Sequence, residues 1–408
     1  MSERPGAAAD ELPDLLYSDA ELALTDALAS LLADRSGVEK AHARIESAQT
    51  YDDKLWEAVA ADLGCAGLLI PEHDGGAGAS YREAAAVAEV LGAHVAPVPF
   101  LGSAVVATAA LLSVVASGAP ASTGTPFTPA RAAADLLAKM ADGGVTAALA
   151  VSFAAGPGAA FPASVRVAGP KPGDAATGVA RLRGMVTGVA DALPAGMLLV
   201  PADGVPHGLY LVDVAAEGVG KAPVTSLDMT RQLCDLSFDD APATLIASGQ
   251  GAERALDAAL SAGAGVLAAE QLGLAQRCLD MTVAYVKERK QFARPVGSFQ
   301  GLKHRLADLW VSVTQARAAS RYAAACLATG ALSDPGDAKV AVALAKAYCS
   351  ETAVQAAQEC VQMHGGIGFT WEHTPHLFLK RAKADSIGFG TADAHRAALA
   401  SLVNLPAS

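Results

Sequence analysis

The stretch 273–310 constrains the fold most, because its residue pattern fits a helix, a turn and a second helix. Residues 273–289 are rich in helix formers. The turn then contains Pro295, which lacks an amide donor, and the flexible Gly297. A new helix is predicted to start near Ser298. Its apolar residues recur at spacings of four, three and four, the stripe of a packed helix, at Leu302, Leu306, Leu309 and Val313.

The turn between these helices concentrates cations around an amide and an aromatic ring. Arg289, Lys290 and Arg294 lie at the helix end and in the turn, with Gln291 and Phe292 between them. A guanidinium on a loop offers several donors in fixed geometry and suits a phosphate or pyrophosphate. The ring could stack against a base. A basic helix C-terminus is also what the helix dipole favours, so the residues alone leave a ligand site and an ordinary helix end both open.

Composition excludes some classes of function. With 408 residues the chain is long enough for two or three domains, and its net charge of -12 argues against a nucleic-acid partner. The start of the chain has no apolar signal core, and the window 101–116 is short for a membrane span, so a buried helix is expected there. The cysteines form no C-x-x-C pair and no metal-ligand spacing, and are expected to be reduced core residues of a cytoplasmic protein. They are Cys65, Cys234, Cys278, Cys326, Cys349 and Cys360.

The first part of the chain predicts helices with clear start signals. Ser18 and Glu21 form a capping box, and Ser80 and Glu83 repeat it for a helix that stops at Gly92. The first of these helices carries an apolar face of Leu24, Leu28, Leu31 and Leu32, and another helix is expected over 51–63. The Pro-, Ser- and Gly-rich segment 119–129 is expected to be a linker or loop.

The middle of the chain changes pattern after a short helix over 130–141. Short apolar runs at 145–153, 165–167, 180–187, 197–200 and 208–212 alternate with Gly, Pro and Asp, which predicts a β domain, a small barrel or sandwich. Helical sequence then returns over 251–289, 298–330, 335–364 and 377–403, with Asp334 and Pro335 as helix-start residues. The fold class is therefore α+β, with helical residues 1–129, a central β domain at 130–247 and a four-helix bundle at 248–408.

Two motifs carry a resemblance to a known family. The run ERKQFARPVGSFQ at 288–300, with GLAQR before it and LADL after it, and the run QMHGGIGF at 362–369 resemble the acyl-CoA dehydrogenase family of flavoproteins. The phrase at 56–78 resembles the N-terminal helical domain of that family, whose barrel lies between two helical domains. The resemblance implies FAD as cofactor. It also implies that the residues reaching a neighbouring subunit's FAD are Arg289, Gln291, Phe292, Gln362, Gly365 and Gly366, while Thr391 contacts the chain's own FAD.

The residues that would serve the chain's own flavin depart from the family pattern. The barrel loop at 152–160 lacks the family's acidic residue, and the segment 185–190 lacks its Trp. The α-proton of an acyl-CoA is removed by a carboxylate. Phe389 stands where most members have that Glu, and Gly263 stands at the other base position that the family uses.

Other candidates for a base are weak. Glu270 lies two helical turns from Gly263. Asp385, one turn before Phe389, is the fallback, and His364 and His373 are expected to be loop and interface residues. No catalytic residue and no metal site is therefore assigned to this chain.

This division of residues is typical of a non-catalytic subunit. The expected function is to complete the FAD site of a heteromeric enzyme that α,β-desaturates acyl-CoA thioesters, in an α2β2 heterotetramer with a catalytic paralogue and without a membrane. The run QMHGGIGFTWEH at 362–373 resembles subunits of heteromeric acyl-CoA dehydrogenases that act on steroid side chains. Two alternatives stay open: a homomeric flavoenzyme of the same fold that uses FAD for different oxidation chemistry, and a scaffold with no flavin role.

Overall fold

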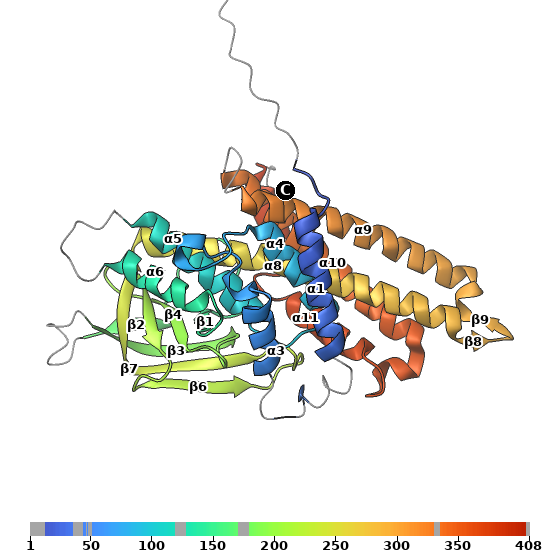
Figure 1. Ribbon diagram of the computed structural model, residues 1–408, viewed down its shortest axis with the longest axis horizontal. Helices are drawn as coiled ribbons and strands as arrows, with labels where there is room; N and C mark the ends of the chain where they lie inside the picture. Colours follow the sequence, from blue (N-terminus) through green and yellow to red (C-terminus); the bar gives the residue numbers. More distant parts are fainter. Residues whose placement is uncertain are drawn as a thin grey trace, which may run out of the picture.

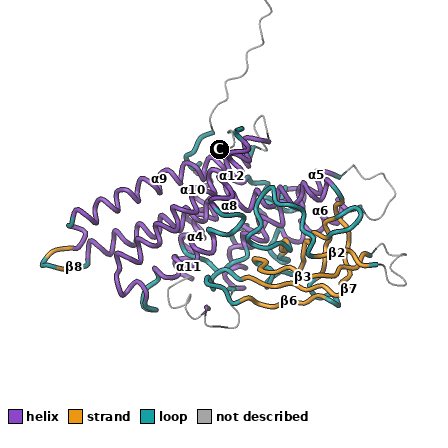
Figure 2. The backbone as a smooth tube through the Cα atoms, turned by 180° about the vertical axis from the view of Figure 1, so that it is seen from behind, coloured by secondary structure: helices purple, strands orange, loops and turns teal. Residues whose placement is uncertain are grey.

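The chain folds as helices, then strands, then helices, and one helix connects all parts. In the computed structural model, the described residues are 13–35, 44–45, 47, 51–118, 128–169, 179–329 and 335–404. Helix α8 (Gln250–Glu288) starts beside the strands and runs outward to the β8–β9 tip (Figure 1). The strands gather at the other end of the molecule, as the view from behind also shows (Figure 2).

The N-terminal helices start at the predicted caps. Helix α1 (Asp19–Arg35) follows a capping box in which the Ser18 amide donates to Glu21 at 2.6 Å, and α4 (Tyr81–Ala93) follows the box of Ser80 and Glu83. The predicted helix at 51–63 is α3 (Asp53–Glu57) extended by a π-helical turn, Ala58–Asp62. The other helices are the π-helical Phe100–Ala107, α5 (Thr108–Ser117) and α6 (Pro129–Met140). Most of the predicted linker at 119–129 lies outside the described residues.

The central strands form a barrel. The strands are β1 (Ala147–Leu149), β2 (Val165–Ala168), β3 (Ala180–Ala190), β4 (Met197–Ala202), β5 (Gly208–Asp213), β6 (Val219–Val224) and β7 (Leu233–Ser248). Their order is β1-β4-β5-β7-β3-β2, with β6 on β7. Backbone bonds from Val167 to Asp203 (2.9 Å) and from Asp203 to Val165 (2.8 Å) bring β2 back to the end of β4. A barrel, rather than a sandwich, therefore results.

The long C-terminal helices pack side by side. They are α8, α9 (Gln300–Ala328) and α10 (Pro335–His364), followed by α11 (Pro375–Asp385) and α12 (Ala392–Leu402). The prediction of one last helical stretch over 377–403 is wrong in one respect. A turn at 386–391 divides this stretch into two helices, and Phe389 and Gly390 in the turn have positive φ. The expected N-cap Asp334 lies outside the described residues.

Small residues set the distance between α8 and the helix α4. A Cβ on Gly273 would overlap the backbone oxygen of Glu89, and a Cβ on Gly92 would overlap the backbone oxygen of Glu270. Glycine at these positions lets two helix backbones touch, and the alanine-rich stripes beside them fill the remaining space. The close approach brings α4 directly over the middle of α8.

Among the described residues, two helical segments are long and apolar enough to span a membrane by length and composition. They are Phe100–Ser117 and α8, whose apolar windows are 72% and 89% buried inside the molecule. Burial on all sides is what a core helix shows, and this agrees with the expectation of a buried helix at 101–116.

The α4–α8 contact predicts the effect of one methyl group. Gly273→Ala is expected to lower the free energy of unfolding by about 1–3 kcal/mol or more, because the new Cβ displaces the backbone of α4. Gly301→Ala is the matched control, since a Cβ at Gly301 in α9 meets no atom within 4 Å, and it should stay within about 1 kcal/mol of wild type. Urea unfolding of both variants measures the difference; equal stability would contradict the packing account.

Candidate functional site

The predicted turn after α8 is a β hairpin with a strained tip. Strand β8 (Lys290–Gln291) pairs with β9 (Arg294–Pro295), and the two residues between them, Phe292 and Ala293, have φ of 52° and 60°. A two-residue loop with both φ values positive is a type I′ turn, which normally takes Asn and Gly. Neither residue here is Gly, so the tip stores backbone strain of the kind that is found at functional sites.

The hairpin presents its predicted ligand residues to solvent. Phe292 is 86% exposed, and Arg289 and Gln291 are exposed as well. Within the described part of the chain, no hydrogen bond or ion pair involves the guanidinium of Arg289. The hairpin is held from below by Phe299, whose ring lies 3.9 Å from the Arg294 guanidinium and 6.2 Å from the Phe292 ring. The hairpin therefore exposes the side chains of Arg289, Gln291 and Phe292 to solvent, while Phe299 packs against the Arg294 and Phe292 side chains.

The second motif reaches the same end of the bundle. Gln362 is exposed near the end of α10, and Gly365 and Gly366 begin the 3-10 turn Gly365–Phe369. The ring of Tyr285 in α8 stacks on His364 at 4.2 Å, and its hydroxyl donates to the His364 carbonyl at 3.4 Å. His364 is therefore a buried support residue that ties the two motif-bearing helix ends together.

Gly365 and Gly366 expose their backbone, because no side chain or neighbouring atom of the described residues covers it. Gly365 adopts φ of 64°, and a Cβ at Gly365 or Gly366 would meet nothing within 4 Å. We call the exposed predicted cofactor residues at this end of the bundle the donor end. They are Arg289, Gln291, Phe292, Gln362, Gly365 and Gly366. The donor end offers a cation for phosphate, a ring for a base and backbone open to close approach. This chemistry fits a phosphorylated dinucleotide such as FAD.

Thr391 does not join the donor end. Its side chain caps α12 by accepting from the Ala394 amide at 3.3 Å, and Figure 2 shows α12 well away from β8. His373 lies 6.5 Å from His364, ring to ring, in the loop after α10. Six of the seven predicted cofactor residues thus lie at one end of the bundle, and the seventh lies near the barrel-facing turn that carries Phe389.

The two positions where the family places its base meet each other inside the protein. Phe389 is 4% exposed, and its ring lies so close to Gly263 that a Cβ there would be 2.9 Å from two ring carbons. The ring also packs edge-on against Phe153 at 5.4 Å, and the Phe389 amide donates to the Phe153 carbonyl at 2.7 Å. Hydrocarbon fills the space between Phe389 and Gly263, where a cavity of about 20 Å³ adjoins the ring, and Phe153 also lines a larger cavity of about 640 Å³.

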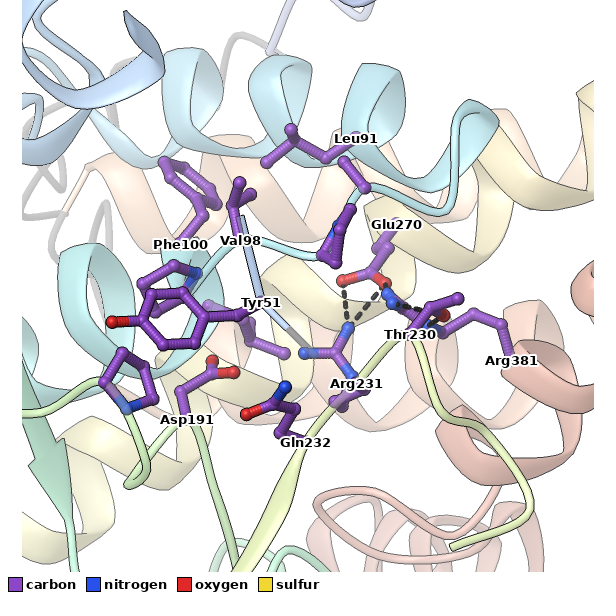
Figure 3. A pocket seen from close by; sticks show the side chains of 15 residues that line it. Tyr51, Leu91, Val98, Phe100, Asp191, Thr230, Arg231, Gln232, Glu270 and Arg381 are labelled. Carbon is purple, nitrogen blue, oxygen red and sulfur yellow. Dashed lines mark hydrogen bonds and ion pairs between the residues drawn. The ribbon is translucent and has the colours of Figure 1, made fainter. Parts of the chain in front are cut away.

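A buried charge cluster lies beside the aromatic pair and joins all parts of the molecule. Glu270 of α8 accepts from Arg231, which precedes β7, at 2.6 Å and from Arg381 of α11 at 2.5 Å (Figure 3). Arg381 also pairs with Asp228 at 2.6 Å. Burial alone would raise the pKa of Glu270, but the two guanidinium groups outweigh it and the pKa is lowered. Glu270 is therefore a paired anion and not a free base.

Asp385, the fallback base, belongs to the same cluster. It is fully buried, and its Oδ1 lies 3.3 Å from Arg231, while its Oδ2 has no hydrogen-bond partner among the described residues. Burial, and next the charge of Glu270, raise the pKa of Asp385 to about 7. The carboxyl group does not line the described cavities that adjoin Phe153 or Arg231.

The cluster contains residues that the sequence analysis did not single out. These are Asp228, Thr230, Arg231 and Arg381, and Phe153 of the adjacent aromatic pair was not singled out either. A signal was present in the segment 228–231, where an acid, a hydroxyl and a cation lie between two strand-like apolar runs. Buried charges occur mostly in pairs, so such a segment predicts a partner elsewhere in the chain, although not which one.

The raised pKa of Asp385 predicts a pH effect on stability. A carboxyl group with a folded pKa of about 7, above its ordinary value of about 3.9, stabilises the fold at low pH and loses that contribution as the pH rises to about 7. Asp385→Asn cannot ionise, so its melting temperature should rise relative to wild type between about pH 5 and pH 8. Asp239→Asn, whose side chain is 93% exposed, should show no such trend. A parallel trend in both variants would contradict the assignment.

Comparisons with known proteins agree with this geometry. Sequence profiles for the acyl-CoA dehydrogenase N-terminal and C-terminal domains match residues 18–122 and 249–403. The chain is 33% identical over 359 residues to acyl-CoA dehydrogenase IpdE2 of Mycobacterium tuberculosis, covering 88% of this chain and 89% of that one. It is 32% identical to acyl-CoA dehydrogenase FadE27 of the same organism, covering 84% and 86%.

Solved structures give the same result. A variant of the Tcur3481-Tcur3483 steroid ACAD superposes with a TM-score of 0.77 at 27% identity, covering 95% of this chain and 98% of that one. The ChsE4-ChsE5 complex of Mycobacterium tuberculosis gives 0.78 at 25% identity, covering 97% and 100%. The three-part fold and FAD as the cofactor of this group are thereby confirmed. The chain belongs to the acyl-CoA dehydrogenase family.

Proposed function

We propose that this chain is a non-catalytic subunit of a heteromeric acyl-CoA dehydrogenase, in which its donor end completes the FAD site of a catalytic paralogue. The complex would be an α2β2 heterotetramer that introduces an α,β double bond into an acyl-CoA thioester. FAD, when bound, supplies the acceptor for the hydride that leaves the β-carbon. Residence in the cytoplasm and the domain limits at 129/130 and 247/248 stay predictions.

One observation carries the proposal. Both positions from which the family draws its base are occupied by groups that cannot accept a proton, and these two groups are in contact inside the protein. An acidic side chain at Gly263 would have no room, because the Phe389 ring, packed against Phe153, fills the space around it. Of the carboxylates nearby, Glu270 is paired with Arg231 and Arg381, and Asp385 accepts from Arg231 through Oδ1 and lines none of the described cavities beside Phe153 or Arg231.

The donor end supplies the other half of the proposal. Arg289 would bind the FAD pyrophosphate as a forked donor, and Phe292 with Gln291 would pack on the adenosine side. Gln362 would donate to the cofactor, and the bare backbone at Gly365 and Gly366 would allow close approach. The type I′ tip fixes Phe292 outward before any ligand binds, which lowers the conformational entropy lost on binding. Thr391 is proposed as a remnant contact of the chain's own flavin site.

The names of similar proteins support assembly with a second chain. The solved structures with 25–27% identity are a complex of ChsE4 with ChsE5 and a protein named by the pair Tcur3481-Tcur3483. The latter is called a steroid ACAD, so a thioester with a bulky polycyclic acyl group is the substrate class we propose for the complex.

Purification of the chain with and without its paralogue tests whether the flavin and the catalytic base come from the paralogue. Expressed alone, the chain should retain little flavin and show no acyl-CoA dehydrogenase activity, since it has no base of its own. Coexpression with a paralogue that carries a Glu at either base position should give a yellow, active complex. Flavin absorbance and dye reduction measure both. An active yellow homo-oligomer would refute the proposal that the chain is a non-catalytic subunit. Full flavin occupancy without a partner, together with inactivity towards acyl-CoAs, would favour the homomeric flavoenzyme.

A point substitution tests the donor end directly. In the coexpressed complex, Arg289→Ala should raise the dissociation constant for FAD by about 10- to 100-fold, because a charged hydrogen bond to phosphate contributes about 1.5–3 kcal/mol. Arg254→Ala is the matched control, an exposed arginine near the other end of the same helix. Equal flavin content in both variants would indicate a scaffold with no flavin role.

A further inference from the structure

Two cysteines lie side by side between α8 and α10, beneath the donor end. Cys278 of α8 and Cys360 of α10 are both fully buried, and the thiol of Cys278 hydrogen-bonds to the sulfur of Cys360. Two helical turns after Cys278, Tyr285 stacks on His364, which follows Cys360 by one turn. Neither cysteine lines the described cavities beside Phe153 or Arg231. The pair is therefore separate from the centre of the molecule and adjoins the support of the second motif.

A histidine lies against one of the two sulfurs. Nδ1 of His364 is 2.7 Å from the Cys360 carbonyl oxygen and 3.7 Å from the Cys360 sulfur. A carbonyl oxygen can only accept, so Nδ1 carries a hydrogen, and this N–H is shared between the oxygen and the sulfur. The Tyr285 ring covers the imidazole at 4.2 Å, and an aromatic face stabilises a cation. The surroundings therefore suit a Cys360 thiolate beside a His364 imidazolium.

The ionisation of Cys360 differs from that of other buried cysteines in the chain. The hydrogen bond from Cys278, together with that from His364, lowers the pKa of Cys360 against the effect of burial, whereas burial raises the pKa of Cys278. Burial alone would lower the pKa of His364, but its bonds to Cys360 raise it. Burial raises the pKa of Cys65 and that of Cys349 to about 12. Because the thiolate is the reactive form of cysteine, Cys360 is the nucleophile and Cys278 is the neutral thiol beside it.

The end of α10 gives a small oxidant a route to the Cys360 sulfur. His364 is the last residue of this helix, and the next residue, Gly365, is exposed and has φ of 64°. Helix ends open locally at a much lower free energy than a packed core does. Hydrogen peroxide is little larger than water, and Cys360 lies one turn before the end. Opening of the last turn is therefore sufficient for access.

We infer that Cys278 and Cys360 are a redox site, at which a peroxide oxidises the two thiols to a reversible disulfide between α8 and α10. All six cysteines are free in the structure, which is therefore the reduced state of this site. The inference goes beyond the proposed function, because the site requires neither flavin nor a partner chain. Disulfides that form and are reduced again are the kind that redox-sensing proteins use.

The oxidation balances in two steps. The Cys360 thiolate attacks one oxygen of hydrogen peroxide, the O–O bond breaks, and a proton from the His364 imidazolium converts the leaving hydroxide into water. The Cys278 sulfur then attacks the sulfenic acid on Cys360, the S–O bond breaks, and the Cys278 proton leaves with the hydroxide as a second water. The sulfurs lose the two electrons that the peroxide gains.

Peroxide treatment of the full chain tests this site. After exposure to hydrogen peroxide, the chain should lose two of its six thiols, counted with a thiol reagent after denaturation, and dithiothreitol should restore both. Mass spectrometry of an unreduced digest should find one peptide that joins Cys278 to Cys360. Retention of all the thiols, or oxidation spread over the other cysteines, would overturn the inference.

Two variants separate the roles of the residues. Cys278→Ser should leave Cys360 as a sulfenic acid that dimedone labels, and His364→Phe, which keeps a ring against Tyr285, should slow oxidation at pH 7 by at least about tenfold because less thiolate is present. The matched controls are Cys65→Ser and Cys349→Ser, whose buried thiols donate to backbone carbonyls, and both should form the disulfide at the wild-type rate. Absence of the dimedone label, or a wild-type rate in His364→Phe, would contradict the assignment.

Flavin measurements keep this result separate from the proposed function. In the coexpressed complex, Cys278→Ser should keep its flavin and form no disulfide, whereas Arg289→Ala should lose flavin and still form the disulfide. Full flavin content in Arg289→Ala together with a normal disulfide would refute the role of the donor end and support the redox site. Disulfide formation that fails in Arg289→Ala would show that the site depends on bound flavin and would overturn the inference.

Discussion

The ion pairs of Glu270 with Arg231 and Arg381 connect the barrel to the C-terminal helices. Arg231 arrives from the segment before β7, Arg381 from α11, and Glu270 from the middle of α8, so one carboxylate joins the barrel to two helices of the bundle. Removing such charges from water is costly, and the cost is offset only when every partner is in place. The cluster therefore fixes how the barrel sits on the bundle more than it adds net stability.

The same ion pairs bear on the proposal that this chain is a non-catalytic subunit. Glu270 is paired with Arg231 and Arg381, and Phe153 and Phe389 pack against each other beside them. The Arg231 guanidinium lies 5.4 Å from the Phe153 ring, so the cluster and the aromatic pair also support each other. The two aromatic rings thus occupy the position of the base, while the carboxylates beside them are paired with arginines.

The sequence predicts some layers of this structure better than others. Helix starts were predictable because capping is local: Ser18 with Glu21 and Ser80 with Glu83 form the expected bonds. Strands β6 and β7 were not identified, although β7 buries alternate residues such as Cys234, Leu236 and Phe238.

The same distinction applies to the site. The donor-end residues were found through a motif, and their meeting depends on the Tyr285–His364 stack, which joins residues far apart in the chain. The partners of Glu270 could not be predicted, because Arg231 and Arg381 come from segments that only the tertiary fold brings together. Local chemistry is therefore readable from the sequence, while pairing across the core requires the coordinates.

The length of α8 has a geometric consequence. Arg289 lies nineteen positions after Glu270, just past the end of α8, which at 1.5 Å per residue is about 28 Å. No proline interrupts this stretch, and it acts as a stiff spacer that prevents the hairpin from folding back over its own barrel. The donor end is therefore held away from the barrel of its own chain, and in a pair of chains related by a two-fold or pseudo-two-fold axis the arm of each would extend towards the other.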